Sequence, residues 1–160
     1  MACAIRANVE RLMMNRSAVV LALLILALST SAAPAETKDD AAIREAVDRA
    51  YVRGVHVDAD PELMRGGMHE TFIMYVPVEG GVTQLTRDAW IERIATAKAR
   101  AADAPRPKTT ADITILDRTE NAAVVRVKLF RDGKQIFTDY ISLYQVGAEW
   151  KLVGKIFQRH

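Results

Sequence analysis

Apolar residues recur at helical spacing in the first half of the chain. A stripe at spacings of four, three and one residues predicts a helix over residues 39–53, and Gly54 would end it. An Asp-Pro pair followed by two glycines predicts a second, short helix over residues 60–67. Thr86 predicts the N-cap of a third helix, which ends before a loop rich in alanine and proline. The first half is therefore expected to supply three helices.

The remaining pattern is typical of strands, because apolar and polar residues alternate in short runs separated by turn residues. Short turns join the last four runs, so we expect an antiparallel meander. Such a sheet must cover one face, and three helices are available. The predicted fold is α+β, a cone in which a curved, mainly antiparallel sheet wraps around three helices and leaves a cavity. The predicted strands are residues 69–78, 82–85, 111–117, 122–130, 135–145 and 149–158.

The N-terminus has a different pattern. Two arginines precede an apolar run at residues 18–33, and small residues follow, as in a secretory signal peptide. Ala33 and Ala35 supply the small side chains that signal peptidase requires, so we expect cleavage after Ala35. This predicts a signal peptide at residues 1–35, a single domain at residues 36–160, and a periplasmic or secreted protein. An uncleaved membrane anchor is the alternative.

The net charge and the composition limit the kinds of partner that we expect. The segment before residue 36 carries three arginines and one glutamate, so the net charge of +2 disappears with it. A neutral domain gives no reason to expect a nucleic-acid partner, and we expect no stable membrane insertion after cleavage. Cys3, the only cysteine, is removed too, so no disulfide is expected. The start codon stays open between Met1, Met13 and Met14.

Motifs for common cofactors and metals are missing from the sequence. It contains no G-x-S-x-G, no phosphate-binding glycine loop and no G-x-G-x-x-G. The three histidines are scattered, without the H-x-x-x-H or H-x-H spacing of a metal site. We therefore expect neither a cofactor nor a metal.

The closing segment DYISLYQVGAEWKLVGKIF, residues 139–157, resembles the end of the putative lumazine-binding family within the nuclear transport factor 2-like superfamily. The segments RAYVRG and MHETFIMY fit the same pattern. The resemblance implies a cone with an internal pocket. Relatives with this fold include ketosteroid isomerase, scytalone dehydratase, limonene epoxide hydrolase and polyketide cyclases, which use Asp, His and Tyr side chains, whereas others only bind or dimerise. The fold alone does not decide between them.

Two residues are candidate catalytic groups. Asp139 lies on the more apolar face of its strand, where desolvation would raise its pKa and make it a general base. His69 opens the first strand and is the other candidate base. Alternatively, Asp139 lies at a frayed strand end and pairs with Arg126 or Lys155. Regular alternation places Lys155 on the same face as Lys151, which we expect to be the solvent side.

Large side chains are the candidate ligand contacts. Tyr140 faces the opposite way from Asp139, so that face is either a ligand wall or a dimer interface. His56 is expected in a loop, as a surface or capping residue. The favoured function is an exported protein that binds a small apolar or aromatic molecule, as a homodimer. The alternatives are a cofactor-free isomerase, dehydratase or cyclase, or a structural dimerisation module. The predicted ligand contacts are Tyr51, Phe72, Met74, Trp90, Phe137 and Tyr140.

Overall fold

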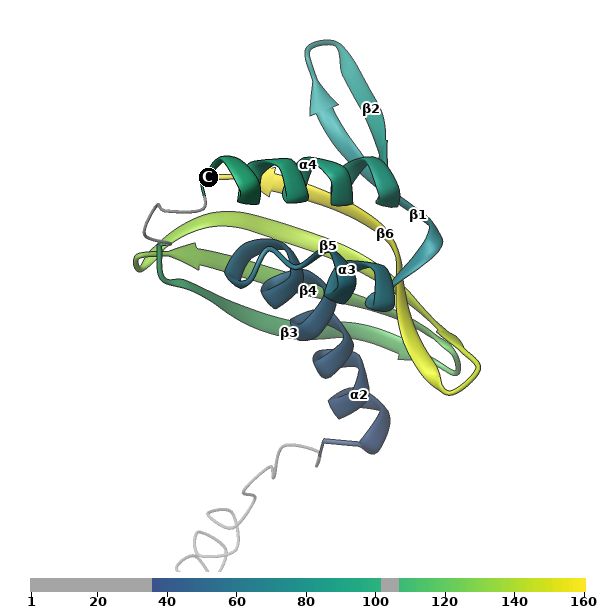
Figure 1. The fold of residues 1–160 in the computed structure, drawn as a ribbon. Coiled ribbons are helices and arrows are strands. Elements are labelled where there is room, and N and C mark those ends of the chain that lie inside the picture. Colours follow the sequence, from purple (N-terminus) through teal and green to yellow (C-terminus); the bar gives the residue numbers. More distant parts are fainter. Residues whose placement is uncertain (1–35, 102–106) are drawn as a thin grey trace, which may run out of the picture. The chain divides into compact units, whose positions relative to one another are not determined.

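The computed structural model describes residues 36–101 and 107–160 (Figure 1), and the predicted signal peptide lies outside them. Helix α2 (Lys38–Val47) opens with a capping box, in which the Thr37 hydroxyl accepts from the Asp40 N–H and the Asp40 carboxylate accepts from the Thr37 N–H. The predicted apolar stripe of this helix is buried. Within the described ranges, no helix has the length and hydrophobicity needed to cross a membrane.

The first helix does not end at Gly54, so that prediction is wrong. The chain continues from α2 into a π-helix, η2 (Asp48–Val57). Gly54 is buried, and a Cβ added there would lie 3.1 Å from Met64 Cγ. The glycine therefore allows close packing against α3 (Pro61–Gly67), whose N-cap is Asp60, as the sequence predicts.

Six strands form one sheet in the order β2-β1-β6-β5-β4-β3. Only the β1–β6 pair is parallel, and the other pairs are antiparallel. The sheet curves around the helices, and the β1–β2 hairpin projects beyond them (Figure 1). The predicted α+β fold is confirmed. The remaining elements are β1 (Met68–Val78), β2 (Gly81–Thr86), α4 (Arg87–Arg100), β3 (Thr109–Thr119), β4 (Ala122–Arg131), β5 (Lys134–Val146) and β6 (Glu149–Arg159).

Strand β5 separates the two faces of the sheet as its alternation predicts. Asp139, Ile141 and Leu143 are buried on the concave face, where the helices pack. Tyr140 and Tyr144 are exposed on the opposite face. Asp139 therefore lies inside, well away from either end of the strand, so the predicted frayed end is wrong, whereas the predicted pairing with Lys155 is observed.

Strand β6 contains a bulge that changes which side chains point inward. The β5 partners of Leu152 and Gly154 are adjacent residues, so Val153 is an extra residue in β6. The extra residue reverses the alternation, and both Leu152 and Lys155 are buried although they differ in parity. Lys155 thus faces inward with only 6% exposure. The prediction that it shares the solvent side with Lys151 is wrong.

Candidate functional site

A cavity of about 350 Å³ lies between η2, α4 and the concave face of the sheet. Its walls come from six elements, so the whole fold has to form before the cavity exists. Aromatic rings make up much of the wall, and three of the lining residues are cationic. The lining residues are Tyr51, Val55, His56, Met74, Trp90, Ile94, Arg131, Phe137, Lys155, Phe157 and Arg159.

The π-helical segment explains how η2 contributes three lining residues. In an α-helix, residues five apart point roughly 140° away from each other. In a π-helix the hydrogen bonds link residues five apart, so Tyr51 and His56 share one face with Val55. The rings of Tyr51 and His56 meet edge to face, with centroids 5.0 Å apart. The sequence analysis placed His56 in a loop because Gly54 was expected to end the helix, and this prediction is wrong.

A buried ion pair forms the floor of the site. Lys155 Nζ lies 2.7 Å from Asp139 Oδ1, and their side chains are 5% and 0% exposed. Burial raises the pKa of Asp139 and lowers the pKa of Lys155, while the attraction between the two charges opposes both shifts. The attraction between the two charges therefore holds the pair together against the cost of burying it.

Aromatic rings surround the Lys155 ammonium group. Its Nζ lies 4.4 Å from the centroid of Phe157 and 5.0 Å from that of Tyr51. The centroids of Trp90 and Phe137 follow at 5.3 and 5.9 Å. Such distances allow cation–π attraction, which partly replaces the water that the ammonium group has lost.

One polar group of the cavity wall, His56 Nε2, lacks a hydrogen-bond partner within residues 36–101 and 107–160. Burial, together with the charges of Lys155 and Arg131, lowers the pKa of His56 from 6.5 to about 3. Burial, the Asp139 charge and a hydrogen bond to the Asp139 carboxylate raise the pKa of Tyr51 well above 10. Both side chains are therefore neutral at physiological pH, and the free ring nitrogen of His56 is available to a ligand.

The structure brings together four of the six predicted ligand contacts. Tyr51, Met74, Trp90 and Phe137 line the cavity. The other two do not. Phe72 stacks on Trp90 in the core, with ring centroids 5.8 Å apart, and Tyr140 is 40% exposed on the convex face of the sheet. The sequence missed His56, Lys155 and two arginines at the ends of β4 and β6.

The two candidate bases do not meet. Asp139 lies behind Lys155 and is absent from the cavity wall, and His69 is absent from it too. His69 Nδ1 lies 2.8 Å from the Thr71 hydroxyl near the start of β1. No shared site for a pair of bases exists at these positions. Among the described residues there is also no cluster of three acidic, histidine or cysteine side chains that could hold a metal ion.

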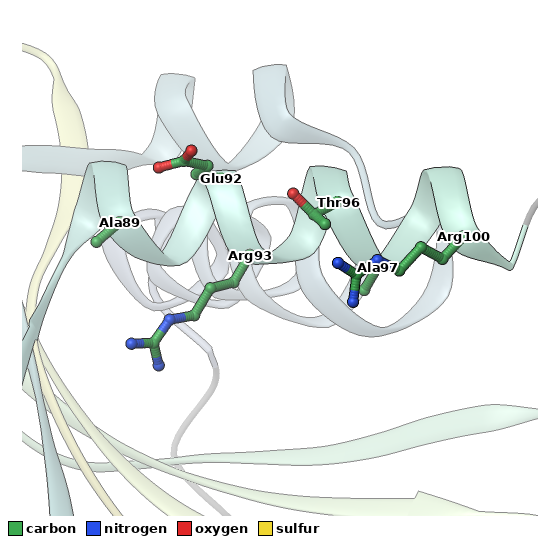
Figure 2. A pocket seen from close by; sticks show the side chains of 6 residues that line it. All are labelled: Ala89, Glu92, Arg93, Thr96, Ala97 and Arg100. Carbon is green, nitrogen blue, oxygen red and sulfur yellow. The ribbon is translucent and has the colours of Figure 1, made fainter.

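A second concavity, of about 720 Å³, follows the surface of α4 (Figure 2). A single helix supplies every described residue of its wall, and most of these side chains are exposed. It offers no buried polar group to orient a ligand, so the aromatic cavity is the better candidate. Its lining residues are Ala89, Glu92, Arg93, Thr96, Ala97 and Arg100.

Solved structures share the fold. An NTF2-like protein of unknown function from Shewanella baltica is 24% identical, with a TM-score of 0.60, covering 77% of this chain and 94% of that chain. One from Silicibacter pomeroyi is 18% identical, with a TM-score of 0.59, covering 77% and 97%. A putative aromatic ring hydroxylase from Novosphingobium aromaticivorans is 14% identical, with a TM-score of 0.56, covering 74% and 87%. The comparison with curated proteins gave no match.

The family assignment rests on a match over nearly the whole described domain. Residues 38–158 match the family model described as "Putative lumazine-binding". That range runs from the start of α2 almost to the end of β6, so it includes every lining residue of the cavity except Arg159. This match shows that the chain belongs to the putative lumazine-binding family, and the chain shares its fold with solved NTF2-like proteins.

Proposed function

We propose that this protein binds a small, mostly apolar organic molecule in the aromatic cavity. The observation that carries the proposal is the cavity wall itself, in which four aromatic rings lie around a histidine nitrogen without a hydrogen-bond partner. Ligand sites of proteins are typically apolar hollows of roughly 300–1,000 Å³ with a few polar groups that orient the ligand. The volume of about 350 Å³ suits a molecule of one or two fused rings.

Binding is favoured over proton-transfer catalysis by the position of the acid. A general base must come within hydrogen-bond reach of the proton that it removes. Asp139 is fully buried, with Lys155 between it and the cavity. His69, the other candidate base, lies outside the cavity wall. Neither of the two predicted bases can therefore touch a ligand in the cavity.

The proposal includes a homodimer that pairs through the convex face of the sheet. That face presents large apolar side chains to solvent, and Tyr140 and Ile156 are cross-strand neighbours on it. Tyrosines are enriched in protein interfaces, and an apolar exposed face of a sheet is a reason to expect a partner. The exposed apolar residues on β4, β5 and β6 include Val124, Tyr140, Tyr144 and Ile156.

The proposal also includes export to the periplasm or beyond the cell, supported by the signal-like pattern of residues 1–35. The mature chain recovered from the native host should then begin at Glu36, which intact-mass measurement and N-terminal sequencing would show. A chain that keeps residues 18–33 after membrane extraction would instead identify an anchor.

Native mass spectrometry of protein purified from its own host tests the binding function. We expect a retained small molecule, released on unfolding. Ile94→Trp should fill the cavity from α4 and abolish the retained mass, because Ile94 lines it. Ala97→Trp adds the same side chain at an exposed position of the same helix outside this cavity, and it should leave the retained mass unchanged. Equal loss in both variants, or no cavity-dependent ligand at all, would refute the function.

A further inference from the structure

The charged side chains that line the cavity are all basic. Arg131, Lys155 and Arg159 line it, and its wall contains no acidic side chain within the part of the chain that the structure describes. Asp139, which lies outside the wall, is already paired with Lys155 at 2.7 Å. The two arginines therefore leave the mouth of the cavity positively charged.

Both arginines are available to a ligand. Neither has an ion pair with any residue of 36–101 or 107–160, and both are exposed. The Arg159 guanidinium lies over the Phe137 ring, 5.5 Å from its centroid, which holds it at the rim. Arg131 is close enough to His56 for its charge to lower the pKa of that histidine. A guanidinium group is the side chain best suited to bind a carboxylate, through two parallel hydrogen bonds.

The interior favours the ring of a ligand rather than its charge. Tyr51, Trp90, Phe137 and Phe157 surround Lys155, and a further aromatic face would extend the same contacts. A carboxylate placed this deep would approach Asp139, whose charge Lys155 already balances. Burying a second anion beside the first is costly, because the remaining positive charge cannot compensate both.

We propose that the cavity takes a flat aromatic monocarboxylate, with its ring inside and its carboxylate at the mouth on Arg131 and Arg159. This inference rests on the proposed binding function and names the class of its ligand. His56 Nε2, which lacks a hydrogen-bond partner in the described structure, would meet a polar atom on the ring. The cavity volume of about 350 Å³ limits the ring system to roughly two fused rings.

The test is a titration by calorimetry with two matched probes, naphthalene-2-carboxylate and naphthalene-2-carboxamide. They share shape and ring area and differ in charge. We expect the carboxylate to bind about tenfold or more tightly, because a hydrogen bond to a charged group adds that much. Arg131→Gln and Arg159→Gln should each bring the ratio of the two dissociation constants towards one. Added salt should reduce the ratio in the wild type, since the arginines are exposed.

Lys134→Gln is the matched control. Lys134 is the β5 partner of Arg131 and is exposed, but it does not line the cavity. This substitution removes one positive charge from the same turn. The ratio of the two dissociation constants should stay at its wild-type value. Circular dichroism and thermal unfolding would verify that each variant is folded.

Each result decides something. Equal affinity for the two probes would overturn the inference while leaving the binding function in place. Failure of both probes to bind would overturn the function and the inference together. A ratio that falls as much in Lys134→Gln as in Arg131→Gln would show that the preference is a long-range charge effect, and it would overturn the assigned contact.

Discussion

Lys155 and Asp139 form an ion pair beneath an aromatic cavity, with Nζ 2.7 Å from Oδ1 and almost no exposure of either side chain. Removing two charges from water costs several kcal/mol for each ion, and their attraction offsets that cost only in part. The pair is therefore weak support for stability by itself. Its structural effect is to keep a cation at the cavity floor and to withdraw the carboxylate from the ligand.

Replacing one partner of the ion pair should destabilise the protein more than replacing both partners. Lys155→Met leaves Asp139 buried without its partner, and Asp139→Val does the same to Lys155. Each should lower the free energy of unfolding by about 3–5 kcal/mol. The double variant should be about as stable as the wild type, because apolar side chains in a buried site need no partner. Urea unfolding monitored by tryptophan fluorescence measures all four proteins.

The double-mutant cycle contains its own control, since each single variant makes one of the two changes of the double variant. A double variant that loses as much free energy as the two singles combined would show that the residues act independently. The ion pair would then have no role in the cost of either single change.

His56 should make the fold sensitive to acid. Its folded-state pKa of about 3 lies below the ordinary 6.5, so between these values the unfolded chain binds a proton that the folded chain excludes. The stabilisation is fully present above pH 6.5 and is lost as the pH falls towards 3. Between pH 7 and pH 4 the loss should be on the order of 3 kcal/mol, measured as the free energy of unfolding in urea.

His56→Phe isolates this effect, because it keeps a ring at the position and removes the titrating group. Asp139 has a raised pKa and acts in the opposite direction, but it is present in both proteins. The difference between wild type and variant should therefore change with pH along the curve of a single proton. Parallel pH profiles for the two proteins would rule out His56 as the source.

The fold could be predicted from local sequence signals, because most helices and strands carry a signal within their own residues. Asp60 and Thr86 mark two helix starts in the sequence, and both are N-caps in the structure. Strand alternation assigned Asp139 and Tyr140 to opposite faces of β5, as observed. These signals depend on hydrogen bonds and periodicities within a few residues, so no tertiary information is needed to recognise them.

The site was harder to predict because two of its residues depend on irregular backbone. His56 reaches the cavity through a π-helix, and Lys155 reaches it through the bulge at Val153. Both irregularities change the direction of the following side chains without any distinctive sequence pattern. Arg131 and Arg159 meet only because β4 and β6 end near the same cavity, which is a property of the sheet order.

The packing of α3 against η2 should be sensitive to the addition of a single methyl group. A Cβ added at Gly67 would lie 2.3 Å from the Cβ of Ala50, so the backbones would have to separate. Gly67→Ala should reduce the free energy of unfolding by about 1–3 kcal/mol. At the neighbouring Gly66 an added Cβ meets nothing within 4 Å, so Gly66→Ala should be neutral or slightly stabilising. Equal effects at the two positions, in parallel urea titrations, would show that helix propensity rather than close packing controls this segment.

The convex face of the sheet gives the test of the proposed dimer. Ile156 is 55% exposed and lies across from Tyr140, so a lysine there would place a charge in the middle of the apolar face. Ile156→Lys should convert the dimer to a monomer in sedimentation velocity, because a buried unpaired charge costs several kcal/mol.

Val82→Lys is the matched control for this dimer. Val82 is 67% exposed on β2, at the opposite end of the sheet order from β3, and its replacement should leave the dimer intact. A dimer that survives Ile156→Lys but dissociates with Val82→Lys would move the interface to the projecting hairpin. If the wild type sediments as a monomer at all concentrations, the proposed dimer is refuted. Because the cavity lies on the concave side, the monomeric Ile156→Lys variant should still discriminate between the two naphthalene probes as the wild type does.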